Sequence, residues 1–164
     1  MYSTRISHRI RAPRSAVYHA LIDADAIAKW RVPSGMSSVV HEFDAREGGS
    51  FRVSLTYDAP TGTGKSAAHT DTYHGHFVAL VPNERVVELL EFETADPAFR
   101  GQMTMTTTLT EVNRGTDVLI VHEGIPDSVP AADSETGTRM ALANLARFVE
   151  GNQSTVLPPL GAPQ

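Results

Sequence analysis

Two blocks of sequence near the C-terminal end decide the fold: DVLIVHE, residues 117–123, and GTRMALANLARFVE, residues 137–150. The first block is rich in β-branched residues, as strands are. The second is the only long helix that the sequence predicts. Five apolar residues form a stripe along it at helical spacing: Ala141, Leu142, Leu145, Phe148 and Val149. We therefore expect this helix to cover the apolar face of the strands that precede it.

Those strands are visible as runs in which apolar and polar residues alternate. In residues 51–57 every second side chain is large and apolar, which is the period of a half-buried strand. The predicted strands are 6–10, 36–44, 51–57, 70–81, 85–94, 101–112 and 116–123. Between the first two strands, Pro13 suits the first turn of a helix, and a second short helix would end at Trp30.

This order of elements predicts the α+β class. We expect a curved antiparallel sheet of six to seven strands wrapped around one long C-terminal helix, with two short helices between the first and second strands. The right-handed twist of strands curls such a sheet, and a curled sheet that grips a helix leaves room for a cavity. Residues 1–151 would form a single domain. A loop at 59–68 and a disordered, proline-containing tail at 152–164 complete the prediction.

Composition excludes several classes of protein. The net charge of −5 and the absence of any basic run argue against a nucleic-acid partner, because binding phosphates needs clustered lysine and arginine. No cysteine is present, so disulfides and thiolate chemistry are excluded. No stretch approaches the roughly 18 apolar residues of a membrane span. We expect a soluble cytoplasmic protein, with homodimer formation left open by the edges of the sheet.

Seven short motifs occur in a distinctive order: IRAPRSAVY (10–18), AKW (28–30), FDAREGGSF (43–51), YHGHF (73–77), LVPNERVV (80–87), GT (115–116) and HEG (122–124). Over about residues 4–150 this order resembles the START-like (SRPBCC, helix-grip) superfamily. Within it, the chain is similar to bacterial proteins related to the C-terminal domain of activators of heat-shock-protein-90 ATPase. The resemblance implies a hydrophobic cavity but no single function, since relatives include lipid carriers, polyketide cyclases and co-chaperone domains.

One position departs from the family pattern at the start of the long helix. The family usually has tryptophan after the glycine that begins this helix, whereas Thr138 follows Gly137 here. If Thr138 faces inward, the cavity is roomier or more polar at that end. The predicted ligand-binding residues are Trp30, Phe43, Arg52, Tyr57, Phe77, Phe92, Met103, Met105, Thr138, Ala141 and Leu145. The alternative is that the bulky side chains among them fill the space.

His122 is a candidate catalytic residue on the last strand. Alternation places it on the same face as Val118 and Ile120, which would turn it toward the cavity. There it could act as a general acid or base near neutral pH. The interpretation that we favour is the ordinary one, a histidine near the strand end with its hydrogen bonds satisfied.

Glu88 is the second catalytic candidate. It alternates with Val86 and Leu90, so it could point inward, where burial would raise its pKa and suit it to act as an acid. Arg52 or Arg100 could then pair with it. Again we favour the ordinary interpretation, placement on the surface.

A His-x-His pair, His74 and His76, leaves one face of a strand and could begin a metal site. His69 or Asp71 could supply a third ligand, but strand parity puts both on the opposite side. We therefore predict no metal and no cofactor.

Three functions remain. The first is binding of a small hydrophobic ligand, lipid-like or aromatic and polyketide-like, in the internal cavity. The second is a polyketide cyclase- or dehydratase-like enzyme, which needs polar residues converging inside the cavity, with His122, Glu88, Arg52 and Tyr57 as the residues to inspect. The third is a co-chaperone-like protein-interaction module.

Overall fold

The strands form one antiparallel sheet, and two short helices connect its two edge strands. The structure, a computed structural model, describes residues 1–58 and 70–156, with side chains as far as Gly151. Its elements are β1 (Tyr2–Ile10), α1 (Arg14–Leu21), α2 (Ala24–Trp30), β2 (Met36–Phe43), β3 (Ser50–Tyr57), β4 (Thr70–Val81), β5 (Arg85–Phe92), a 3-10 turn η1 (Pro97–Phe99), β6 (Met103–Val112), β7 (Gly115–Ile125) and α3 (Ala131–Val156). All neighbouring strands are antiparallel, in the order β1-β7-β6-β5-β4-β3-β2.

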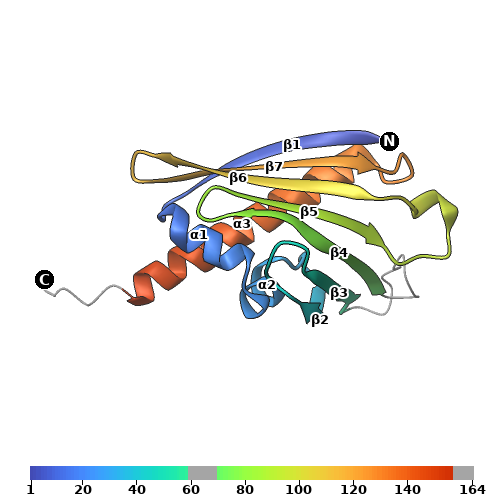
Figure 1. The fold of residues 1–164 in the computed structure, drawn as a ribbon, viewed down its shortest axis with the longest axis horizontal. Coiled ribbons are helices and arrows are strands. Elements are labelled where there is room, and N and C mark those ends of the chain that lie inside the picture. The colour runs from blue at the N-terminus through green and yellow to red at the C-terminus, as the bar shows by residue number, and fades with distance from the viewer. Residues whose placement is uncertain (59–69, 157–164) are drawn as a thin grey trace, which may run out of the picture.

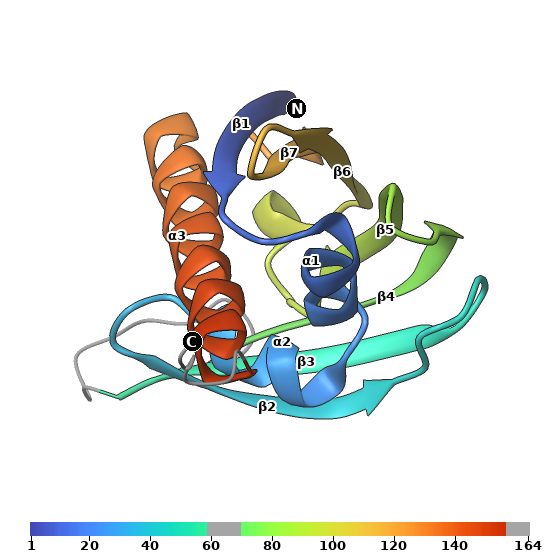
Figure 2. The same ribbon diagram turned by 90° about the vertical axis from the view of Figure 1, so that its left-hand side faces the viewer.

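The predicted fold class is confirmed. Seven strands form one sheet, two short helices lie between the first and second strands, and the longest helix ends the described chain. Figure 1 shows α3 running along the sheet. In Figure 2 the sheet curves from β2 and β3 through β4 and β5 to β6, β7 and β1, and α3 lies across the open side. The twist expected of antiparallel strands thus produces a concave face that α3 covers.

Element boundaries differ most at the long helix. It begins at Ala131 rather than Gly137, because the carbonyl of Pro130 accepts the first backbone hydrogen bonds, from Asp133 and Ser134. It also continues to Val156, so the first residues of the tail expected at 152–164 belong to α3, and 157–164 lie outside the described residues. The loop expected at 59–68 likewise lies outside them. No helix in the described part of the chain is long and apolar enough to cross a membrane.

The turn between β2 and β3 depends on two glycines. Gly48 has a φ of 83°, a left-handed conformation that disfavours other residues. A Cβ on Gly49 would lie 2.0 Å from the carbonyl oxygen of Asp44. The pair therefore serves the turn, as the sequence pattern predicts.

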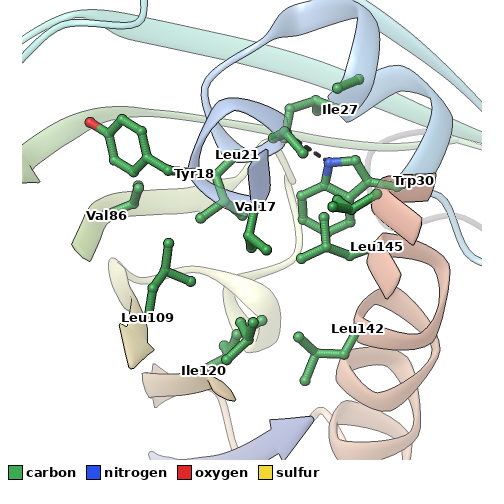
Figure 3. Packing of buried hydrophobic residues seen from close by; sticks show 14 of the residues in the cluster. Val17, Tyr18, Leu21, Ile27, Trp30, Val86, Leu109, Ile120, Leu142 and Leu145 are labelled. Carbon is green, nitrogen blue, oxygen red and sulfur yellow. Dashed lines mark hydrogen bonds between the residues drawn. The ribbon is translucent and has the colours of Figure 1, made fainter. Parts of the chain in front are cut away.

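The core joins α3 to the sheet and to the two short helices. Leu142 and Leu145 of α3 are fully buried, and Figure 3 shows them turned toward Ile120 of β7 and Trp30 of α2. The indole nitrogen of Trp30 donates to the carbonyl of Ala20, 2.8 Å away, which ties α2 to α1. The predicted apolar stripe of α3 faces the core as expected, although Ala141 is only partly buried. These contacts fix α3 against one end of the sheet and leave the other end free to form a pocket.

Candidate functional site

A pocket of about 300 Å³ lies between the concave face of the sheet and the first turns of α3. This volume is at the lower end of the range typical of ligand sites. The sheet contributes side chains from β3 to β7, and α1, α2 and α3 close the remaining sides. Most of the lining is apolar, including Trp30, Leu90, Phe92, Met103, Ile120 and Ala141. Such a lining suits a molecule with a mainly hydrocarbon surface.

Eight of the side chains singled out from the sequence line this pocket. They are Trp30, Phe92, Met103, Met105, Thr138 and Ala141 among the predicted binding residues, and His122 and Glu88 among the catalytic candidates. Thr138 is buried and faces the pocket, with its hydroxyl donating to the carbonyl of Ser134 at 3.1 Å. The position where the family usually has tryptophan is therefore a small residue on the pocket wall.

Five predicted binding residues lie elsewhere. Phe43 and Phe77 pack edge to face with ring centroids 5.4 Å apart, and Phe77 also contacts Phe51 at 5.2 Å, so this end of the sheet is solidly filled. Leu145 lies one turn beyond Ala141 and belongs to the packed core.

The other two, Arg52 and Tyr57, belong to β3. Arg52 alternates with the inward-facing Phe51 and Val53, so it leaves the opposite face, where Nε and Nη2 donate to the carboxylate of Glu93 at 2.7 and 2.9 Å. Tyr57 is the last residue of β3, and it is half-buried and outside the pocket lining.

Strand register brings His122 and Glu88 toward one another. Met105 pairs with His122 on one side and with Glu88 on the other. Residues directly opposite one another on antiparallel strands project from the same face of the sheet. The three side chains thus form a row across β5, β6 and β7 on the pocket wall.

Arg31, which the sequence analysis did not single out, completes this polar row. Its Nη1 donates to Oε1 of Glu88 at 2.8 Å, and its Nη2 donates to Sδ of Met105 at 3.4 Å. The guanidinium carbon lies 5.4 Å from the ring centroid of Tyr73, within cation–π range. Burial opposes the charge on Arg31, but attraction to Glu88 and Tyr73 outweighs it and raises the pKa of Arg31 above its ordinary value. Arg31 is therefore a cation inside the pocket.

The favoured surface placement of Glu88 is wrong, and so are its expected partners. Glu88 is buried, with 5% of its surface exposed. Arg52 binds Glu93 instead, and Arg100 donates to the backbone carbonyls of Thr94 and Ala95. The alternation with Val86 and Leu90 correctly predicted that Glu88 points inward. Its partner is Arg31, the residue that follows α2.

His122 and Tyr73 each present a polar atom that lacks a protein partner. Among the residues that the structure describes, neither Nε2 of His122 nor the hydroxyl of Tyr73 has a hydrogen-bond partner, although both atoms are buried. The favoured interpretation of His122 as a satisfied histidine is thus wrong for this nitrogen. Burial, followed by repulsion from Arg31, lowers the pKa of His122 to about 4, and burial raises the pKa of Tyr73. Both side chains are uncharged at neutral pH.

The sequence model of the family described as activator of Hsp90 ATPase homolog 1-like protein matches residues 11–150. The chain belongs to this family. The match covers most of the sheet, both short helices and the part of α3 that lines the pocket. The resemblance drawn from the motif order is confirmed. No curated protein matches the sequence significantly.

Solved structures of similar proteins share the fold of this AHSA1-like chain. Protein CV1439 from Chromobacterium violaceum is 32% identical, with 92% of this chain and 99% of that chain covered and a TM-score of 0.80. The AHSA1-like protein from Aeromonas hydrophila is 19% identical, with coverages of 92% and 94% and a TM-score of 0.72. DynU16, a putative protein in the dynemicin biosynthetic locus, is 21% identical over 93% of this chain and 48% of its own, with a TM-score of 0.66.

The His-x-His pair of this AHSA1-like chain lies on the outer face of the sheet. Nδ1 and Nε2 of His74 lie 3.0 and 3.1 Å from Glu93 and Glu91, whereas His76 is exposed. Asp71 is buried, and His69 lies outside the described residues. Within residues 1–58 and 70–156 no group of three or more His, Asp or Glu side chains is placed to hold a metal ion.

The lowered pKa of His122 predicts a pH-dependent loss of stability in this AHSA1-like protein. The unfolded chain takes up a proton near pH 6.5, whereas the folded chain does so only near pH 4. Between these values the unfolded state binds more protons, so the free energy of unfolding falls as the pH is lowered from 6.5 to 4. We expect this residue to contribute roughly 3 kcal/mol of that fall.

Urea unfolding at several pH values measures this contribution as a difference between variants. His122→Gln is expected to flatten the pH dependence between 6.5 and 4. His76→Gln, at an exposed position, is the matched control and should keep the wild-type slope. Equal slopes for wild type and His122→Gln would refute the assignment.

Proposed function

We propose that this AHSA1-like protein binds a small, mainly apolar molecule in the pocket between the sheet and α3. One observation carries the proposal: an apolar pocket of about 300 Å³ whose wall holds two buried polar atoms, on Tyr73 and His122, that have no partner among the residues the structure describes. Pockets of this kind use an apolar lining for affinity and a few polar groups for orientation. The description of DynU16 as part of a biosynthetic locus favours a small organic molecule.

A pocket-filling variant tests this proposal. Thr138→Trp puts a large ring on the pocket wall. We therefore expect the affinity for the neutral fluorescent dye N-phenyl-1-naphthylamine to fall by about tenfold or more, because forcing extra bulk into a packed space typically costs about 1–3 kcal/mol. The dye's fluorescence increase on binding is the measurement.

The matched control is Thr136→Trp, at an exposed position on the same helix and outside the pocket lining. It should bind the dye as the wild type does. Failure of the wild type to bind the dye, or equal losses in the two variants, would count against the proposal.

A second candidate, acid–base catalysis of the polyketide cyclase or dehydratase type, is favoured by one observation. Of the four polar residues named for this role, His122 and Glu88 line the pocket, and Nε2 of the neutral His122 has no partner in the described part of the chain. Incubation of wild type and His122→Gln with a host metabolite extract separates the two functions. A metabolite consumed only by the wild type supports catalysis, whereas a molecule bound and released unchanged supports binding alone.

A further inference from the structure

The two pocket atoms that lack a partner among the described residues belong to Tyr73 and His122, which both lie near Arg31. The ring of Tyr73 lies below the guanidinium of Arg31, and His122 is the strand neighbour of Met105, whose sulfur accepts from Arg31. Both atoms are buried, and buried polar groups in native proteins nearly always have a partner. The polar part of the pocket is therefore incomplete until a further hydrogen-bonding group enters it.

The charges around these atoms disfavour an ionised ligand. Within the described part of the chain, the charged side chains of the lining at neutral pH are those of Arg31, Glu88 and the exposed Asp133. Arg31 is already paired with Glu88 at 2.8 Å, so an entering carboxylate meets no free cation among the described lining residues and is repelled by Glu88 and Asp133. An ammonium group would have to compete with Arg31 for Glu88. Either ion would lose its hydration without gaining a free partner of opposite charge among the described lining residues.

An uncharged hydroxyl group matches both atoms. The phenol of Tyr73 can donate or accept a hydrogen bond, and Nε2 of a neutral imidazole does one or the other according to its tautomer. A hydroxyl can donate to one atom and accept from the other, whichever tautomer His122 adopts. We propose that the ligand of this pocket is an uncharged apolar molecule carrying a hydroxyl group that pairs with Tyr73 and His122. This inference rests on the proposed function, since it specifies the ligand of the same pocket.

Three probes of nearly equal shape test the inference: naphthalene, 2-naphthol and 2-naphthoate, each used at pH 7 to displace N-phenyl-1-naphthylamine from the full chain. Two hydrogen bonds should make 2-naphthol bind roughly tenfold more tightly than naphthalene. 2-Naphthoate should bind more weakly than 2-naphthol, because its carboxylate finds no free cation.

Variants at Tyr73 and at His122 assign the preference to its atoms. Tyr73→Phe should reduce the preference for 2-naphthol over naphthalene by about threefold or more, because one of the two hydrogen bonds to the hydroxyl is lost. His122→Phe provides a second, independent readout with the same expected direction. Tyr57→Phe is the matched control, because Tyr57 lies outside the pocket lining and should keep the full preference.

The possible outcomes distinguish failure of the hydroxyl inference from failure of the proposed binding function. Binding of naphthalene with no preference for 2-naphthol, or tightest binding of 2-naphthoate, overturns the hydroxyl inference and leaves a general apolar site in place. Failure of the dye and all three probes to bind overturns both. A preference for 2-naphthol that survives in both Tyr73→Phe and His122→Phe also overturns the inference.

Discussion

Replacing Glu88 with alanine is expected to lower the free energy of unfolding by about 3–5 kcal/mol, because it leaves the charge of Arg31 buried without its partner. The side chains of Arg31 and Glu88 are only 16% and 7% exposed, and their nitrogen and oxygen atoms lie 2.8 Å apart. The cation–π contact with Tyr73 and the hydrogen bond to Met105 would remain, but neither supplies a negative charge. Urea unfolding at pH 7 measures the loss.

Two further variants show whether the loss comes from the unpaired charge. Glu93→Ala removes a carboxylate from the partly exposed contacts with Arg52 and His74. The side chains of Glu93 and Arg52 are 31% and 43% exposed, so this variant should cost less than about 1 kcal/mol. The double variant Arg31→Met with Glu88→Leu replaces the buried pair by apolar groups and should recover most of the stability. A cost for Glu88→Ala no greater than that for Glu93→Ala would contradict this account of the pocket wall.

Replacing Leu145 with alanine is expected to cost about 2–5 kcal/mol, because it opens a cavity between α3 and the core. Leu145 has no exposed surface and lies in the cluster that includes Trp30 and Val17. It lies outside the pocket lining, so the packed half of α3 is separate from the half that faces the pocket. We expect the variant to lose stability without a specific loss of dye affinity at temperatures where it stays folded.

Thermal unfolding and dye titration of the same sample check both parts of this prediction. Arg139→Ala is the control on α3, since its side chain is 61% exposed and its ion pair with Glu135 is long at 3.9 Å. That variant should change the free energy of unfolding by no more than about 0.5 kcal/mol. A fully folded Leu145→Ala that no longer binds the dye would show that the two halves of α3 are not separate.

Sequence periodicity predicted the sheet well because alternation reports directly on which face of a strand is buried. It placed β4 at residues 70–81, as observed, and predicted the inward direction of both Glu88 and His122. It placed the start of α3 six residues too late, because the first turn of that helix is mostly exposed and holds no large apolar side chain that would extend the apolar stripe.

The candidate site was predicted only in part, because alternation shows which side chains point inward but not whether the space in front of them is filled. Phe77 faces inward as alternation requires, yet aromatic contacts fill its end of the sheet, and no periodicity distinguishes a filled end from an open one. Arg31 was missed because its partner, Glu88, is 57 residues away and the contact exists only in the folded chain. The only local signal was its position after Trp30, a buried residue that ends α2.

The central claim, that the pocket between the sheet and α3 takes up an apolar molecule, is tested most directly by NMR of methionine methyl groups. Met103 and Met105 line the pocket, whereas the other three of the five methionines, Met1, Met36 and Met140, do not. Titration with N-phenyl-1-naphthylamine should shift the methyl signals of Met103 and Met105 and leave those of Met1, Met36 and Met140 in place. Shifts confined to the latter three, or no shifts at saturating dye, would contradict the account.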